Sequence, residues 1–168
     1  MSQGVCGMKA VLLVWLYLIL LPVYADNGMA DEVIVNKSER LLYLIRDDKV
    51  IRTFDIALGL APEGHKVQEG DFRTPEGSYL LTRRRIDSDF FMAIEISYPN
   101  EADAARAAEL GVEPGGYIMI HGQPVEPKKP ARYYANYNWT DGCIAVSNAA
   151  MADIWQLTTV NTQISILP

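Results

Sequence analysis

Cysteine and histidine are scarce in this chain. Each occurs only twice among the 168 residues, as Cys6 and Cys143 and as His65 and His121. So few cysteines exclude a disulfide-rich scaffold. One or two cysteines with two histidines also make a poor zinc site, and we expect no metal and no cofactor. Positive charge is short as well, because 15 Lys and Arg face 21 Asp and Glu, for a net charge of −6. Nothing in this acidic composition favours a nucleic-acid partner.

A long apolar run occurs only near the N-terminus, and residues 1–25 are typical of a secretory signal peptide. Lys9 precedes an apolar stretch over residues 10–23, and Val23-Tyr24-Ala25 fits a cleavage site. The stretch is short for a membrane span, which takes about 20 apolar residues. We therefore expect an exported protein of the periplasm or cell envelope, with no stable membrane span after cleavage.

Removal of the signal peptide would leave Cys143 as the one thiol of the chain. A lone cysteine in an oxidising compartment is either a small buried apolar residue or a free reactive thiol. Its neighbours favour the reactive thiol. Gly142 permits a sharp bend and the close approach of a ligand. The amides of Gly142 and Cys143 are then candidates for an oxyanion-binding nest.

Most of the chain beyond a short flexible leader at residues 26–31 is typical of β-strands, and residues 32–168 are expected to form one domain. We predict strands over residues 32–36, 41–46, 50–58, 78–86, 90–98, 116–120 and 162–167. Two helices are predicted, over residues 100–110 and from Ser147 or Asn148 to Leu157. The expected fold is a mostly β sandwich or barrel with two short helices.

A thiol nucleophile needs a base, and the two histidines are the candidates. His121 ends an apolar strand and precedes Gly122, so it has a rigid platform. His65 lies in the irregular, glycine-rich segment 59–77. We prefer His121 on this ground. A hydrogen-bonded structural role remains the alternative for either histidine.

Three short blocks of the sequence, taken in order, resemble the L,D-transpeptidase catalytic domain, or YkuD-type domain, of bacterial cell-wall enzymes. They are Thr74-Pro75-Glu76-Gly77, Ile120-His121-Gly122 and Thr140-Asp141-Gly142-Cys143. The resemblance covers residues 32–168. The last block reads TDGC where the family usually has SHGC. This departure resembles a branch of the family that contains both transpeptidases and a hydrolase of cell-wall cross-attachments.

The resemblance implies a YkuD-type fold and an acyl transfer on peptidoglycan stem peptides. Cys143, with His121 as general base, would form a thioester with a tetrapeptide donor. A diaminopimelate-type amine would then resolve the thioester. If water resolves it, the protein is an L,D-specific cell-wall hydrolase that uses the same pair. A non-catalytic wall-binding module is a further alternative, but the intact cysteine, histidine and glycine argue against it.

Five more residues are candidates for supporting roles. Thr140 either bonds the backbone of the nucleophile turn or is an ordinary strand residue. Asp141 is expected to hold that turn by an Asx-type bond rather than to orient the histidine. Arg84 suits a substrate carboxylate, with a solvated strand face as its alternative. Tyr134 and Trp139, in the tyrosine-rich insert before the cysteine, either line a substrate groove or pack against their own domain.

Overall fold

The computed structural model describes residues 28–168. The predicted signal peptide, residues 1–25, lies outside the described residues, and so do the first two residues of the leader. The end of the leader is packed into the fold, because Ala30 is buried and its amide donates a 2.7 Å hydrogen bond to the carbonyl of Leu157. The predicted flexibility therefore does not extend through Ala30. No helix among the described residues combines the length and apolar character needed to cross a membrane.

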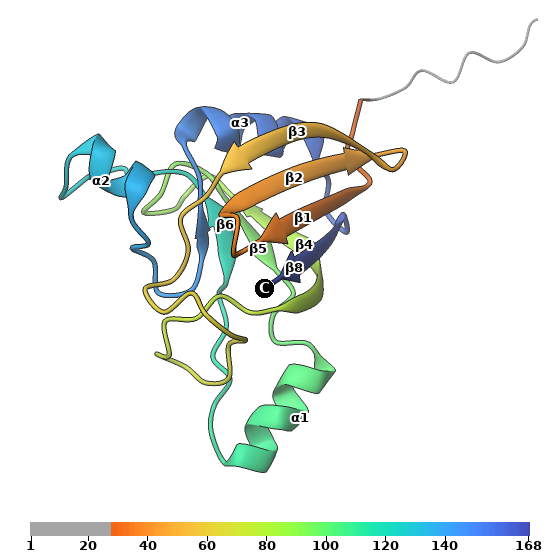
Figure 1. Cartoon of the computed structure of the whole chain (residues 1–168), viewed down its shortest axis with the longest axis vertical. Coiled ribbons are helices and arrows are strands. Elements are labelled where there is room, and N and C mark those ends of the chain that lie inside the picture. Colours follow the sequence, from red (N-terminus) through yellow and green to blue (C-terminus); the bar gives the residue numbers. More distant parts are fainter. Residues whose placement is uncertain (1–27) are drawn as a thin grey trace, which may run out of the picture.

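Eight strands form one curled sheet within residues 28–168. They are β1 (Glu32–Asn36), β2 (Leu41–Arg46), β3 (Lys49–Asp55), β4 (Gly77–Arg85), β5 (Ala93–Ile96), β6 (Met119–His121), β7 (Ile144–Ala145) and β8 (Gln163–Leu167). Their order in the sheet is β3-β2-β1-β8-β4-β5-β6-β7. The β1–β8 and β6–β7 pairs are parallel and the other pairs are antiparallel. Figure 1 shows β1 to β3 lying in front of β5 and β6, so the curled sheet encloses the core.

Strand alternation builds that core. Every second residue of β1 and β2 is fully buried, and β8 buries Ile164 and Ile166 in the same way. The sheet is covered by α3 (Asn148–Leu157), which buries Met151 and Ile154 against it. Each such side chain contributes roughly 1.5–3 kcal/mol by its burial. The side chain of Ser147 caps this helix by accepting a hydrogen bond from the amide of Ala150.

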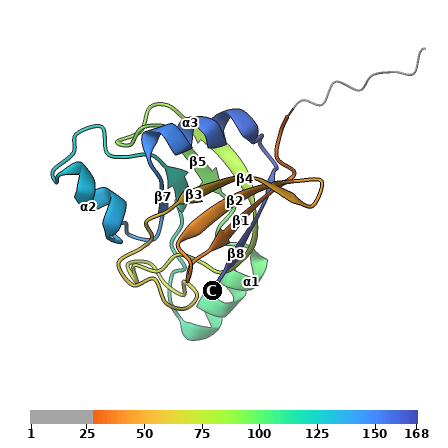
Figure 2. The ribbon, with the colours of Figure 1, turned by 45° about the horizontal axis from the view of Figure 1, so that its top comes forward.

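The described residues contain three helices, so the prediction of two was short by one. The predicted helix at residues 100–110 is α1 (Glu101–Leu110), with Asn100 in a capping box and Gly111 in the left-handed conformation at its end. The helix that was missed is α2 (Ala131–Asn136), which stands beside β7 and away from the sheet (Figure 2). It has six residues, no side-chain cap and tyrosines of modest helix propensity, so the sequence gives little sign of it.

Two strands begin three residues later than predicted. The strand expected from residue 90 begins at Ala93, and Met92 just before it has a φ of 49°. The strand expected from residue 116 begins at Met119, and Tyr117 has a φ of 56°. A positive φ interrupts an extended strand, and for a bulky residue it is an uncommon backbone conformation.

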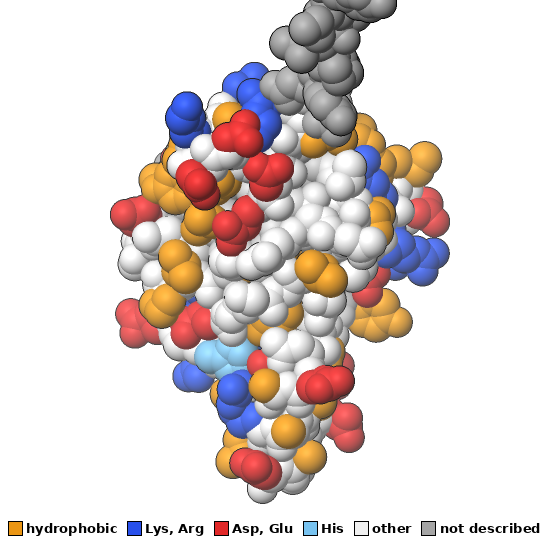
Figure 3. Space-filling view, turned by 90° about the vertical axis from the view of Figure 1, so that its right-hand side faces the viewer, with side chains coloured by type: hydrophobic (Ala, Val, Ile, Leu, Met, Phe, Trp, Pro, Cys, Tyr) orange, Lys and Arg blue, Asp and Glu red, His pale blue; other side chains and the backbone are white. Residues whose placement is uncertain are grey.

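Charge is distributed as the composition suggests: acidic side chains gather on the upper part of the face in Figure 3, and no broad basic patch appears on that face.

Candidate active site

The pairing of β6 with β7 brings Cys143 and His121 together. Ile120 pairs with Ile144 and His121 with Ala145 in a parallel register. Cys143 immediately precedes β7, so in this register it stands opposite the residue two before His121. Residues two apart on a strand share a face, and so do residues paired across strands. The thiol and the imidazole therefore project from the same face of the sheet.

Thr140 holds the turn that carries the thiol. Its hydroxyl donates a 2.7 Å hydrogen bond to the carbonyl of Cys143 and accepts the amide of Gly142 at 3.2 Å. The prediction that Asp141 holds this turn is wrong, because its exposed carboxylate makes no hydrogen bond with any described residue. The predicted oxyanion nest is also smaller than expected. Of its two amides, that of Gly142 is already bonded to Thr140. Only the amide of Cys143 has no hydrogen-bond partner among residues 28–168.

Position 142 requires glycine for two reasons, its backbone conformation and the lack of room for a side chain. Its φ is 131°, and a Cβ on it would lie 2.7 Å from the carbonyl oxygen of Arg73. Arg73 directly precedes the block that begins at Thr74. The Thr74 hydroxyl is fully buried and accepts the amide of Gly59 at 3.3 Å. The TPEG block therefore packs the irregular segment 59–77 against the nucleophile turn.

The surroundings of the Cys143 thiol keep it protonated. Burial raises the pKa of the thiol to about 11, the Met119 amide that hydrogen-bonds it lowers that pKa, and the negative charge of Asp141 raises it. The thiol itself donates to the carbonyl of Tyr117, with 3.6 Å between sulfur and oxygen. In the resting protein Cys143 is therefore a thiol and needs a base to become a nucleophile.

His121 has its ring fixed for that role. The ring is 1% exposed, and Nδ1 lies 2.8 Å from the carbonyl oxygen of Gly122. A carbonyl can only accept, so Nδ1 carries the proton and Nε2 presents its lone pair. Burial lowers the pKa of His121 to about 4, although the bond to Gly122 acts in the opposite direction. The histidine is neutral at physiological pH and able to take a proton.

Two aromatic rings enclose the imidazole of His121. Phe90 stacks on it with 3.9 Å between ring centroids and 23° between planes, and Trp139 meets it edge-on at 5.6 Å. Sequence reasoning missed Phe90. It belongs to no motif and lies 31 residues before His121 in the chain. The pairing of β5 with β6 and a bridge between Phe90 and Pro124 help to bring it there.

We expect Phe90→Ala to raise the pKa of His121 from about 4 toward its ordinary value of 6.5, because it removes part of the burial. A base with a higher pKa is protonated at higher pH, so the acidic limb of the rate profile should also move to higher pH. An NMR titration of the His121 ring measures the shift directly. Phe90→Tyr keeps the stacked ring and serves as the control, and an unchanged pKa in Phe90→Ala would contradict the expectation.

His65 and Arg84 are both engaged elsewhere. Nδ1 of His65 accepts the amide of Glu76 at 3.0 Å, and Nε2 lies 3.1 Å from a carboxylate oxygen of Asp103 on α1. This histidine therefore ties the segment 59–77 to α1. The guanidinium of Arg84 donates to the carbonyls of Trp155 and Thr158 at 2.6 and 2.5 Å, at the C-terminal end of α3. The interpretation of Arg84 as a substrate ligand is therefore corrected: this residue caps a helix.

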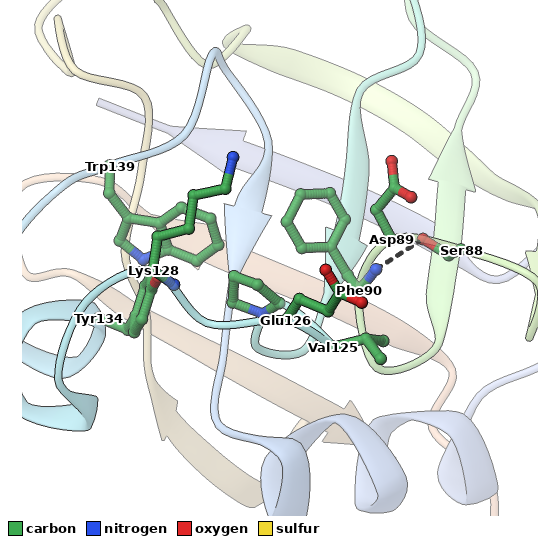
Figure 4. A pocket seen from close by; sticks show the side chains of 9 residues that line it. Ser88, Asp89, Phe90, Val125, Glu126, Lys128, Tyr134 and Trp139 are labelled. Atoms are coloured by element: carbon green, nitrogen blue, oxygen red, sulfur yellow. Dashed lines mark hydrogen bonds between the residues drawn. The ribbon is translucent and has the colours of Figure 1, made fainter.

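Tyr134 and Trp139 line a hollow of about 520 Å³, which we call the aromatic pocket (Figure 4). The two rings meet edge-on at 5.0 Å, and Phe90 forms a further part of the wall. The hydroxyl of Tyr134 accepts the amides of Lys128 and Lys129, so it holds the insert in place. The rings therefore pack against their own domain and also face a hollow, and their role in a substrate groove stays a prediction.

The charge of Asp141 provides a test of the thiol environment. Its carboxylate raises the pKa of Cys143, so Asp141→Asn should lower that pKa and shift the pH dependence of alkylation to lower pH. Turnover should change only mildly. The iodoacetamide rate measured against pH reports the shift. Glu69→Gln is the matched control, because Glu69 and Asp141 both line a second hollow, beside Tyr117. A large fall in turnover together with a moved acidic limb would instead make Asp141 a partner of His121.

Within residues 28–168, no group of three or more His, Cys, Asp or Glu side chains is arranged to hold a metal ion.

A comparison with protein families assigns residues 30–166 to the L,D-transpeptidase catalytic domain, YkuD. The chain belongs to this family, as the resemblance implied. Among curated proteins it is 33% identical over 114 residues to an Escherichia coli K12 protein named "Putative L,D-transpeptidase YafK". That match covers 62% of this chain but only 39% of the relative.

Solved structures confirm the fold. The helical cell shape determining protein Pgp2 from Campylobacter jejuni superposes with a TM-score of 0.59 and 28% identity, over 80% of this chain and 46% of that one. An L,D-transpeptidase from Xylanimonas cellulosilytica gives a TM-score of 0.53 at 17% identity, over 82% of this chain and 60% of that one. The predicted mostly β, YkuD-type fold is confirmed, with the three helices described above.

Proposed function

We propose that this protein is an exported L,D-transpeptidase, a cysteine acyltransferase that acts on peptidoglycan stem peptides in the periplasm or cell envelope. The observation that supports it best is the juxtaposition of Cys143 and His121 on one face of the β6–β7 pair, in a chain of the YkuD family. Family membership supports peptidoglycan as the substrate class. Export rests on the signal-like residues 1–25.

The protonation states of the pair define the first step. Thiol and imidazole are both neutral at rest, since burial raises the pKa of one and lowers that of the other. Nε2 of His121 accepts the thiol proton as sulfur attacks the carbonyl of the L,D-peptide bond, so the base acts during the attack. The unpartnered amide of Cys143 donates to the developing oxyanion.

In the steps that follow, His121 passes the thiol proton to the leaving amine and then serves as the base again. The tetrahedral intermediate collapses, the imidazolium of His121 protonates the departing D-alanine amine, and a thioester remains on Cys143. His121 is then neutral again. It accepts a proton from an incoming diaminopimelate-type amine as that amine attacks the thioester, and the thiol is regenerated.

Mass analysis of muropeptides tests this function. Tetrapeptide muropeptides incubated with the purified protein and an acceptor amine should lose D-alanine and gain the mass of the acceptor. Omitting the acceptor should suppress product if the enzyme is a transpeptidase. Formation of the tripeptide at an equal rate without acceptor would show a hydrolase, and absence of any product would remove the proposed function.

A further inference from the structure

One peptide unit connects the base of the site to the first residue of helix α3. Its carbonyl, that of Gly122, accepts the Nδ1–H of His121 at 2.8 Å. Its amide, that of Gln123, donates to Oδ1 of Asn148, also at 2.8 Å. The bond is trans, so the C=O and the N–H of this unit point in opposite directions. The Asn148 side chain, the peptide unit and the imidazole therefore form one chain of hydrogen bonds.

The peptide units on either side of this one are fixed by Phe91. The carbonyl of Phe91 accepts the amide of Gly122 at 3.0 Å, and its amide donates to the carbonyl of Gln123 at 2.9 Å. Neither bond restrains rotation of the middle unit about the line between its two Cα atoms. Among residues 28–168, only His121 and Asn148 form hydrogen bonds with that middle unit. Asn148 therefore determines which way the Gly122 carbonyl points.

The space at position 122 is occupied by the Asn148 side chain. A Cβ on Gly122 would lie 2.7 Å from Oδ1 of Asn148 and 2.6 Å from the carbonyl oxygen of Phe91. Glycine gives the side-chain amide its room, but it also leaves the backbone freer to rotate than any other residue would. The hydrogen bond from Gln123 to Asn148 opposes that rotation.

Helix capping does not account for the Asn148 side chain. Ser147 is the N-cap of α3, and its hydroxyl accepts the amide of Ala150. The side chain of Asn148 instead reaches back to residue 123, which lies 25 positions earlier in the chain. Its contact is therefore with the backbone next to the base and not with its own helix.

We propose that Asn148 is a positioning residue for the base, which acts through the Gly122–Gln123 peptide unit to keep the ring proton of His121 on Nδ1. A neutral imidazole carries one ring proton, and only the Nδ1–H form leaves Nε2 able to accept the thiol proton of Cys143. If the peptide unit rotates, its carbonyl leaves Nδ1 and the ring proton is free to occupy Nε2. That form cannot act as the base. The effect on turnover rests on the proposed function, whereas the position of the ring proton is a property of the resting protein.

The position of the ring proton can be measured without substrate. ¹⁵N NMR of the imidazole at neutral pH, where His121 is uncharged, distinguishes the Nδ1–H form from the Nε2–H form. The parent protein should show the Nδ1–H form alone. In Asn148→Ala the Nε2–H form should make up at least half of the molecules. Asn148→Asp keeps an oxygen that accepts the Gln123 amide, so it should restore the parent spectrum.

Ser147→Ala is the matched control. It removes the cap of the same helix, one residue away, and leaves the bond between Gln123 and Asn148 in place. Its His121 spectrum should match that of the parent, whatever its melting temperature. An unchanged ring-proton position in Asn148→Ala, or an equal change in Ser147→Ala, would overturn the proposal.

Muropeptide turnover measures the consequence for catalysis. In Asn148→Ala, kcat should fall by about twofold or more, in step with the loss of the Nδ1–H form, while KM stays unchanged. Asn148→Asp should recover most of that loss. If the parent protein converts no muropeptide but the Asn148 variants still move the ring proton, the proposed function fails and the positioning role stands. If the parent turns over and the ring proton does not respond to Asn148, the positioning role alone fails.

Discussion

Cys143→Ser should lose all measurable acyl transfer while the protein keeps its fold. Serine nearly preserves the shape of cysteine, so the turn held by the Thr140 hydroxyl should persist. The reaction, however, needs deprotonation by a base whose pKa is only about 4. A thiol in this buried site already has a pKa raised to about 11, and a hydroxyl is a far weaker acid than a thiol. The imidazole therefore has much less ability to activate serine.

The measurement is muropeptide turnover combined with a thermal melt of the variant. An unchanged melting temperature would show that the lost activity reflects chemistry rather than unfolding. Mass spectrometry should detect a thioester adduct on the parent protein and none on the variant. Full turnover by Cys143→Ser would remove this residue as the nucleophile, and with it the mechanism.

His121→Ala should reduce turnover by about 10²–10⁴-fold, the contribution expected of a positioned general base. The ring donates one hydrogen bond, to Gly122, and packs against Phe90 and Trp139, so a thermal melt of the variant must separate the loss of the base from a loss of stability. His65→Ala should reduce turnover far less. Both ring nitrogens of His65 are occupied, by the Glu76 amide and the Asp103 carboxylate, so its loss should lower stability more than rate.

The pH profile separates these two outcomes. In the parent protein the acidic limb should reflect the low pKa of His121, and it should disappear from the residual activity of His121→Ala. His65→Ala should keep that limb. If the larger loss occurs in His65→Ala at unchanged stability, the assignment of the base is wrong.

Much of the fold could be predicted because local pattern and tertiary structure agree. The alternating apolar residues of β1, β2 and β8 are the ones that the sheet buries. The capping box and terminal glycine of α1 are visible in the sequence as well. The additional helix, α2, was missed because its six residues are held by contacts such as the Tyr134–Trp139 ring pair and not by helix propensity.

The candidate site was predictable only where chemistry restricts the choice of residue. A single thiol in a glycine turn and a strand-end histidine pointed to Cys143 and His121, and the β6–β7 register brings them together. Longer-range contacts gave no such signal. Arg84 reaches the carbonyl of Trp155, 71 residues away, and that contact determines its role. Whether Asp141 or Thr140 bonds the turn likewise depends on side-chain direction, which sequence does not reveal.

The position of β8 determines when this protein can assemble. β8 lies between β1 and β4, in the middle of the sheet, and yet residues 163–167 are among the last described ones to be synthesised. Until they are available, β1 and β4 each lack the strand that pairs with both of them, and only the bridge between Ala57 and Ala145 and other contacts outside β8 can hold the two parts of the sheet together. Contacts of such long sequence separation form slowly. The turn at Cys143 is synthesised before this joining strand. The segment that carries the thiol therefore precedes in the chain the strand that completes the sheet, and the sheet behind the buried site is whole only when β8 pairs with β1 and β4.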